Sequence, residues 1–298
     1  MSAAEKFVTA NGLTLCCQSF GRPGDPALVL IMGMGAQMIG WDEDFCAAIA
    51  GRGFHVVRFD NRDAGRSTRF DFAGIPHVPT TMTLAWMRLP VPAPYLMYDM
   101  ALDVVGLLDA LGIHGAHLVG ASMGGAIAQT LAIHFPERVL SITSIMSTTG
   151  DPDLPPPQSW ALAAVMQPAP REREAYVEHY VTTWKRMRVA SSNEDERRDR
   201  LRARGNHDRG LHPAGAARQL VAILASGSRR KALRKLTVPS LVIHGDVDPL
   251  VPLAAGKDTA RSIPDARLMV LEGMGHGLPF WLWAEIIDAI VDLARRAG

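Results

Sequence analysis

The segment GASMG at 120–124 carries the clearest chemical signal in the chain, because it fits the pattern GxSxG. A short apolar run precedes it and a helical pattern follows. A serine held at a sharp turn between a strand and a helix has strained backbone angles, so glycines two residues before and after it avoid a clash. A glycine-rich turn with a purely structural role is the alternative. Because the flanking patterns are those that the motif requires, we interpret Ser122 as a nucleophile.

A serine hydroxyl needs an imidazole to accept its proton and an acid to orient that imidazole. Both occur downstream of Ser122. An apolar run ends in the acidic loop of VIHGDVDPLVP at 242–252, and His276 follows in the segment GMGHGLP. We predict Asp248 as the acid. Asp246, for which a loop cap is the favoured interpretation, and Asp151, which follows another apolar run, are the alternatives.

Acyl transfer also needs donors for the negative charge that develops on the carbonyl oxygen. The N–H of Met123 lies at the start of a predicted helix, where unpaired amides and the helix dipole favour negative charge. The segment MGMG at 32–35 follows an apolar run, and we assign the second donor to the N–H of Met34. Glycines on both sides let the backbone approach a ligand closely, although a tight turn without a ligand would also require them. This chemistry needs no metal and no cofactor.

Bulky apolar residues near these motifs predict the substrate pocket. Met32 and Met274 belong to the motif segments, and Trp160 and Trp184 come from the central helical region. Flexible methionines and aromatic rings together indicate an adaptable apolar pocket. Ordinary core packing is the alternative for each of them. We expect a small-molecule ester as the partner, because the motifs contain no cluster of charges for a strongly charged substrate.

Short apolar runs alternate with helical patterns along most of the chain, which predicts a mostly parallel α/β sheet with helices on both faces. An Asn-Gly pair at 11–12 predicts an antiparallel hairpin before them. The expected strands lie at 27–32, 55–59, 116–119, 140–146, 238–243 and 266–271, and the expected helices at 42–50, 99–111, 123–135, 254–262 and 283–296.

The length of 298 residues allows more than one compact unit, and the composition changes near residue 150. A proline-rich stretch at 151–157 leads into some seventy residues of charged, helical sequence. We expect one catalytic domain formed by 1–149 and 237–298, interrupted by an inserted helical lid at 150–236. The mixed charges at 194–204 are interpreted as a solvated helix face.

Composition and charge exclude several classes of function. With 31 Lys and Arg against 30 Asp and Glu, the net charge of +1 gives no field that would gather nucleic acid. Three cysteines, two of them adjacent, predict no disulfide framework. The apolar run at 27–41 is too short and too interrupted to span a membrane, and the N-terminus lacks the pattern of a signal peptide. We therefore expect a cytoplasmic protein, with its oligomeric state left open.

Four segments together resemble motifs of the α/β-hydrolase superfamily. They are RFDNRDAGRS at 58–67, GASMGG at 120–125, HGDVDPLVP at 244–252 and GMGHGLP at 273–279. The resemblance implies the α/β-hydrolase fold with an inserted cap and a triad of Ser122, Asp248 and His276, in the chain order typical of that fold. Two positions depart from the family pattern: Met32 stands where histidine is usual, and Asp63 where glycine is commoner.

Within the superfamily, IMGMGAQMIGWDEDF at 31–45 and RFDNRDAGRST at 58–68 resemble the aclacinomycin methylesterase branch, whose members hydrolyse a methyl ester on a polyketide-derived substrate. A group of general carboxylesterases on the same scaffold is the alternative. We therefore expect a serine carboxylesterase that hydrolyses an apolar ester through an acyl-enzyme. Carbon–carbon bond hydrolysis or perhydrolysis on the same triad, and a non-catalytic ligand-binding protein, are the competing hypotheses.

Overall fold

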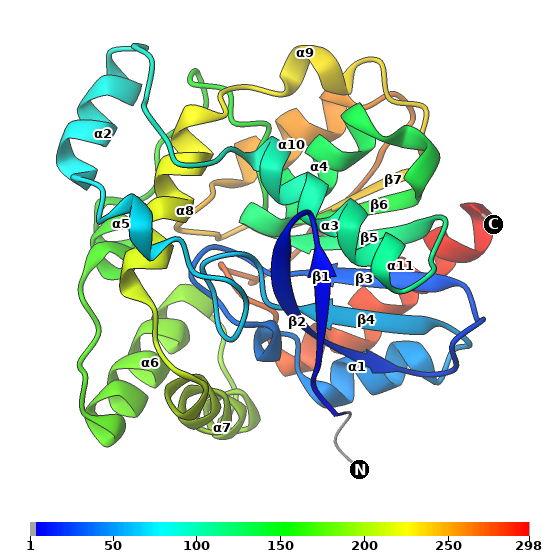
Figure 1. The fold of residues 1–298 in the computed structure, drawn as a ribbon, viewed down its shortest axis with the longest axis horizontal. Helices are drawn as coiled ribbons and strands as arrows, with labels where there is room; N and C mark the ends of the chain where they lie inside the picture. The colour runs from blue at the N-terminus through cyan, green and yellow to red at the C-terminus, as the bar shows by residue number, and fades with distance from the viewer. Residues whose placement is uncertain (1–3, 298) are drawn as a thin grey trace.

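A computed structural model describes residues 4–297 as an eight-stranded sheet between two layers of helices (Figure 1). The strand order is β1-β2-β4-β3-β5-β6-β7-β8. β2 pairs antiparallel with β1 and β4, and all later pairings are parallel, so the mostly parallel sheet expected from the sequence is confirmed. The strands are β1 (Lys6–Ala10), β2 (Leu13–Phe20), β3 (Ala27–Ile31), β4 (His55–Phe59), β5 (Ala116–Ala121), β6 (Val139–Ile145), β7 (Ser240–Gly245) and β8 (Arg267–Leu271).

Helices cover both faces of the sheet (Figure 1). α3 (Met97–Ala110), α4 (Met123–His134) and α10 (Leu253–Ser262) pack on one face, and α1 (Glu43–Ala50) and α11 (Trp283–Ala297) on the other. Successive side chains of a strand point to opposite faces, so each face has its own apolar core. The central strands are buried on both sides, which explains why they lack polar alternation.

The hairpin between β1 and β2 turns at Asn11 and Gly12, as the sequence predicted. Their φ angles are 50° and 73°, and Ala10 pairs with Leu13 across the turn. Two positive φ angles are what a tight two-residue hairpin requires. At the other end of the sheet, β7 begins two residues later than expected, after Pro239, which has no N–H to add to the ladder.

A run of helices separates β6 from β7, and we refer to residues 159–233 as the helical insertion. It consists of α5 (Ser159–Met166), α6 (Arg173–Arg188), α7 (Asn193–Arg209), α8 (Pro213–Ala225) and α9 (Arg230–Leu233). α5 to α8 lie beside the sheet, and α9 lies near α10 (Figure 1). Short 3-10 turns occupy Met38–Gly40, Asp71–Ala73, Pro136–Arg138 and Phe280–Leu282.

The charged helix α7 corrects one sequence expectation, because it is not simply a solvated face. Asp199 is fully buried and forms an ion pair with the buried Arg188. Arg198 reaches α1 and its cap, where it binds Asp42 and Asp44 at 2.9 Å each. Opposite charges at helical spacing look the same in sequence whether they meet water or partner charges on other elements.

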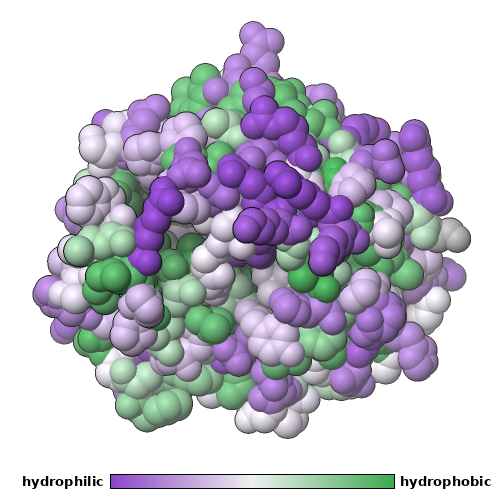
Figure 2. Space-filling view, turned by 90° about the horizontal axis from the view of Figure 1, so that it is seen from above, coloured by the Kyte–Doolittle hydropathy of each residue, from purple (hydrophilic) through white to green (hydrophobic). Residues whose placement is uncertain are grey.

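α2 (Val78–Trp86) was not anticipated, and it packs against α8 at the periphery (Figure 1). Phe72, which precedes it in the chain, and Trp86, its last residue, are 85% and 84% exposed. Seen from above, the surface otherwise interleaves hydrophilic and hydrophobic residues (Figure 2). Within residues 4–297, no helix combines the length and the apolar character needed to cross a membrane.

Candidate active site

Ser122 lies at the turn from β5 into α4, in the strand–turn–helix context that its motif requires. Its φ of 54° and ψ of −119° are strained for a non-glycine residue. A Cβ at Gly120 would collide with the carbonyl of Gly124, and one at Gly124 would collide with the carbonyl of Ile31. The two glycines therefore let β5 and α4 approach closely while the serine hydroxyl stays partly exposed.

The structure brings the three predicted triad residues together at the carboxyl ends of β5, β7 and β8. His276 Nε2 lies 3.1 Å from Ser122 Oγ, and His276 Nδ1 lies 2.8 Å from Asp248 Oδ2. His276 and Asp248 are buried. This geometry can accept the proton of a serine hydroxyl at one ring nitrogen while the other nitrogen is held by a carboxylate.

Asp248 sits in a polar pocket built by its own loop. Its Oδ1 accepts hydrogen bonds from the backbone N–H groups of Leu250 and Val251, at 2.9 and 2.8 Å. Burial acts to raise the pKa of Asp248, but the charge interaction and hydrogen bond with His276 and the Val251 N–H outweigh it, so this pKa lies below its usual value. The carboxyl is therefore held as an anion beside the imidazole.

The two alternative acids lie elsewhere. Asp246 Oδ1 accepts a hydrogen bond from Gly273 N at 2.7 Å, which is the loop-capping role favoured for it from the sequence. Asp151 forms an ion pair with Arg230 at 2.9 Å and a hydrogen bond with Ser228. Neither carboxylate bonds to the imidazole that faces Ser122.

The loop that carries His276 is also held by the helical insertion. The N–H of His276 donates to Met187 O at 2.8 Å, and the N–H of Gly275 donates to Arg188 O at 3.0 Å. The Arg188 side chain is 3% exposed and forms two hydrogen bonds with Asp199 of α7. The end of α6 is therefore fixed where it meets the histidine loop.

The predicted oxyanion donors belong to segments that meet at Ser122. A Cβ placed on Gly33 would be 3.3 Å from Ser122 Cβ, so the loop after β3 passes close to the serine. Among residues 4–297, neither the N–H of Met34 nor that of Met123 has a hydrogen-bond partner. Met32, the departure from the family pattern, contributes its backbone oxygen to a 2.9 Å hydrogen bond from Asn61.

A small cavity of about 80 Å³ adjoins the triad on the histidine side. Its wall includes Ala121 and Gly277, the chain neighbours of Ser122 and His276. The predicted pocket residues Met32 and Trp184 both line it. This cavity has room for only a small group.

A second cavity of about 740 Å³ lies between the loop after β3 and the helical insertion. Met34 and Gly35 form its wall on the core side, and Leu211 and Leu220 are among the apolar side chains on the other. Tyr176 lines this cavity as well. The space is large enough for a multi-ring molecule, since ligand pockets of a few hundred cubic ångströms accommodate drug-sized compounds.

One aromatic stripe on α6 spans both cavities, and only its last member, Trp184, is predicted from the sequence. Tyr176 lines the large cavity, whereas Tyr180 and Trp184 line the small one. Consecutive ring centroids are 6.0 and 5.9 Å apart. The spacing of four residues in the sequence was the signal that would have revealed the stripe.

Met274 and Trp160 correct the pocket prediction. Met274 is fully buried in the apolar core beneath α11, because its loop turns inward after β8. Trp160 lies in a separate hollow on the insertion, where the Arg186 guanidinium stacks 3.9 Å from its ring. Core packing in the first case and a cation–π contact in the second account for these side chains.

Asp63, the second departure from the family pattern, connects the core to the insertion. It adopts a φ of 64°, a value that favours glycine. Its carboxylate accepts hydrogen bonds from Arg218 at 2.7 and 2.8 Å and from Tyr95 at 2.7 Å. Burial acts to raise the pKa of Asp63, but the hydrogen bonds and the Arg218 charge hold it below its usual value.

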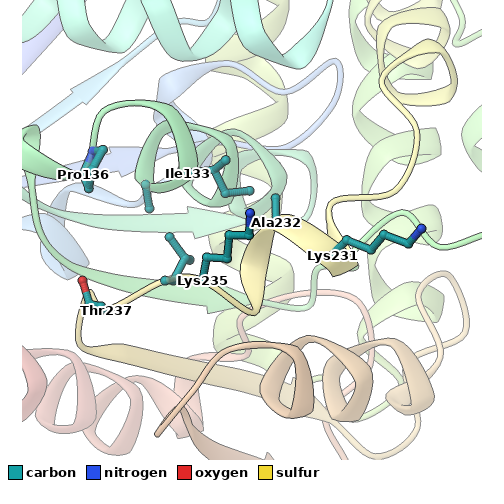
Figure 3. A pocket seen from close by; sticks show the side chains of 8 residues that line it. Ile133, Pro136, Lys231, Ala232, Lys235 and Thr237 are labelled. Atoms are coloured by element: carbon teal, nitrogen blue, oxygen red, sulfur yellow. The ribbon is translucent and has the colours of Figure 1, made fainter.

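A further hollow of about 500 Å³ lies between the end of α4 and the segment from α9 to the start of β7, and it has no comparable chemistry. Pro136, Lys235 and Thr237 are among its lining residues, and Lys231 points away from the others (Figure 3). Within residues 4–297, no group of three or more His, Cys, Asp or Glu side chains is arranged to hold a metal ion.

The fold is that of an α/β hydrolase, and comparison with known proteins agrees. Residues 26–281 match the family model of the alpha/beta hydrolase fold, so the chain belongs to this family. A meta-cleavage product hydrolase from Pseudomonas fluorescens IP01 superposes with a TM-score of 0.76 over 98% of both chains, at 20% identity. The α/β-hydrolase fold expected from the sequence is thereby confirmed.

The curated relatives include methylesterases and an enol-lactonase. The chain is 30% identical to rhodomycin D methylesterase DauP of Streptomyces sp. strain C5, with 98% of each protein covered. It is 27% identical to 3-oxoadipate enol-lactonase 2 of Acinetobacter baylyi, over 89% of this chain and 87% of that protein. The resemblance to a methylesterase branch is confirmed by the first of these matches.

Proposed function

We propose that this carboxylic ester hydrolase cleaves esters that join a small alcohol to a bulky apolar acid, with Ser122 as the nucleophile. The observation that carries the proposal is the hydrogen-bonded series Ser122, His276 and Asp248. The chain neighbours Ala121 and Gly277 line a small cavity, and Met34 of the proposed oxyanion donor lines a large one. The methylesterase relatives support the choice of a small alcohol.

In the proposed mechanism, Ser122 Oγ attacks the ester carbonyl carbon while His276 Nε2 takes the serine proton. The carbonyl oxygen becomes an oxyanion, which the N–H groups of Met34 and Met123 stabilise. When the intermediate collapses, the C–O bond to the alcohol breaks and His276 returns the proton to the leaving alkoxide. The alcohol departs, and the acyl group stays on Ser122 as an acyl-enzyme. Water, activated by His276, then attacks the acyl carbon and releases the acid and Ser122. Asp248 holds the imidazole in the tautomer that faces the serine.

We assign the alcohol part of the ester to the small cavity and the acyl part to the large one. The leaving alkoxide must lie beside His276 Nε2, and the cavity of about 80 Å³ is the one whose wall includes Gly277 of the histidine loop. The alcohol therefore belongs in the small cavity. The acyl part belongs in the apolar cavity of about 740 Å³, beneath the helical insertion. We propose that residues 150–236 act as the lid over this cavity, with 1–149 and 237–298 as the catalytic domain.

A series of esters tests this assignment. One bulky aryl acid is esterified with methanol, ethanol and butanol, and we expect kcat/KM to fall by at least about tenfold from methyl to butyl, because an oversized group strains a filled cavity. Met32→Ala enlarges the small cavity and should restore the butyl ester. Met34→Ala is the matched control, since Met34 lines the large cavity and keeps its backbone N–H.

The nucleophile is tested with Ser122→Ala, which should abolish hydrolysis of the methyl ester while the thermal unfolding curve is retained. Full activity of this variant would contradict the mechanism. A wild-type preference for butyl over methyl would refute the cavity assignment alone. Faster turnover of a vinylogous diketone than of any ester would favour the competing carbon–carbon bond hydrolysis.

A further inference from the structure

We infer that Gln219, a buried residue of α8, is a positioning residue that holds the oxyanion loop in its donating conformation. The oxyanion loop is the turn formed by residues 33–36. The inference rests on the proposed function, because it concerns the N–H of Met34. It assigns to the helical insertion a direct part in shaping the catalytic machinery, in addition to covering the substrate.

The oxyanion loop is a β-turn closed by a single backbone hydrogen bond. The N–H of Ala36 donates to Gly33 O at 3.3 Å, which is a long bond. Gly35, the third residue of the turn, has a φ of 67°, as in a type II turn. The peptide between the second and third residues can rotate between the type I and type II orientations, and glycine permits both. The turn therefore needs an external partner to stay in one form.

Gln219 supplies that partner. Its side-chain oxygen accepts a hydrogen bond from Gly35 N at 2.7 Å, and its side-chain nitrogen donates to Arg62 O at 2.7 Å. Gln219 itself is fully buried, so its side-chain amide is fixed between these two partners. One turn earlier on α8, Ala216 packs on the same glycine, because a Cβ placed on Gly35 would be 3.0 Å from Ala216 Cβ.

Two further side chains hold the ends of the segment that contains the loop, and both come from the catalytic core. Asn61 donates to Met32 O at 2.9 Å, and Asp60 Oδ1 accepts from the N–H of Met38 at 2.7 Å. From the helical insertion, α8 holds the middle of the segment at Gly35, while the end of α7 holds Gln37 through Asn206, Arg209 and Gly210. Gln219 is therefore the contact through which α8 fixes the turn next to Ser122.

Loss of this contact has a defined consequence for catalysis. Without this acceptor, the side chain of α8 no longer holds the N–H of Gly35, and the Met34–Gly35 peptide is free to rotate to the other turn form. The rotation changes ψ of Met34 and φ of Gly35, so the turn that carries the Met34 N–H is no longer held in the form whose donor points at the oxyanion. A single oxyanion donor contributes about 100-fold to 1,000-fold to kcat. Misdirecting it affects the transition state more than the bound substrate.

The experiment compares three variants of the full-length protein with a methyl ester as substrate. Gln219→Met removes both hydrogen bonds at nearly constant volume. Gln219→Glu keeps an acceptor for Gly35 N at the same chain length. Ser226→Ala is the matched control, because Ser226 also lies at α8 and accepts from the core residue Met97 at 2.9 Å, away from the triad.

We expect Gln219→Met to lower kcat by about 10-fold to 100-fold with KM changed less than about threefold, since part of one oxyanion donor is lost. Its affinity for a trifluoromethyl ketone, which binds as an oxyanion, should fall in parallel. Gln219→Glu should recover part of kcat, and Ser226→Ala should leave both quantities near wild type.

Equal effects of Gln219→Met and Ser226→Ala on kcat would overturn the inference, as would a loss of kcat without a loss of trifluoromethyl ketone affinity. If Gln219→Met does not fold, Gln219→Glu decides alone, because this variant keeps an acceptor. A folded Gln219→Glu variant whose kcat is more than about 100-fold below that of the wild type would refute the inference. Ser122→Ala separates the two hypotheses, because its full activity would refute the proposed function itself.

Discussion

Replacing Asp248 with asparagine tests whether Asp248 determines which ring nitrogen of His276 carries the proton. In the structure, Asp248 Oδ1 accepts from Leu250 N and Val251 N, and Oδ2 faces His276 Nδ1. The asparagine oxygen must stay with the two backbone donors, so its NH₂ group points at Nδ1. That nitrogen must then accept, which moves the ring proton to Nε2, opposite the Ser122 hydroxyl at 3.1 Å.

An imidazole protonated on Nε2 cannot take the serine proton. We therefore expect kcat to fall by about 10⁴-fold, as for the same change in other serine hydrolases, or about 5 kcal/mol in activation free energy. Asp246→Asn is the control, because its amide oxygen can still accept from Gly273 N, and it should lose less than about tenfold. Hydrolysis of a fluorogenic methyl ester measures both. A greater loss at position 246, or a loss within tenfold at position 248, would refute the assignment.

Two other predictions concern buried groups away from the triad. Burial lowers the pKa of His117 to about 4, so the stability that comes from its neutral ring is complete above about pH 6.5 and is lost as the pH falls toward 4. Urea unfolding at pH 7.5 and 4.5 should show a decrease in the free energy of unfolding that is about 2 kcal/mol larger in the wild type than in His117→Gln; equal decreases would contradict it. Burial also raises the pKa of Cys46 to about 12, so little of this thiol is in the reactive thiolate form at pH 8. We expect Cys46 to resist a disulfide reagent at pH 8 until urea unfolds the protein. Rapid labelling of Cys46 in the native protein would contradict this prediction.

The sheet could be predicted from the sequence, because the turns that connect its strands and helices depend on residue types that are recognisable in the chain. The Asn11-Gly12 pair tolerates two positive φ angles, and the glycines around Ser122 avoid two backbone collisions. Such signals depend on one residue and its neighbours in the chain. The spacing of Asp248 and His276 after two successive apolar runs placed both at the same edge of a parallel sheet.

Contacts between distant segments left no comparable signal. Met274 and Trp184 are both bulky residues near motifs, yet only one faces a cavity, because side-chain direction depends on how the loop after β8 and α6 are packed. Gln219 meets Gly35 across 184 positions of sequence. Nothing in the local pattern of α8 distinguishes this glutamine from a solvent-facing one.

The ion pair between Asp63 and Arg218 restricts how this enzyme can exchange parts with its relatives. Both side chains are at most 1% exposed, and without Asp63 the buried Arg218 guanidinium keeps only the exposed Asp71 carboxylate, at 3.2 Å. Removing one partner of such a buried pair costs about 3–5 kcal/mol. If the core of a relative had glycine at position 63, this helical insertion would bring Arg218 without its Asp63 partner. In the reverse exchange, an insertion without Arg218 would leave the Asp63 carboxylate of this core without its guanidinium. Recombination between homologues must therefore transfer positions 63 and 218 as a unit, even though 155 residues of chain separate them.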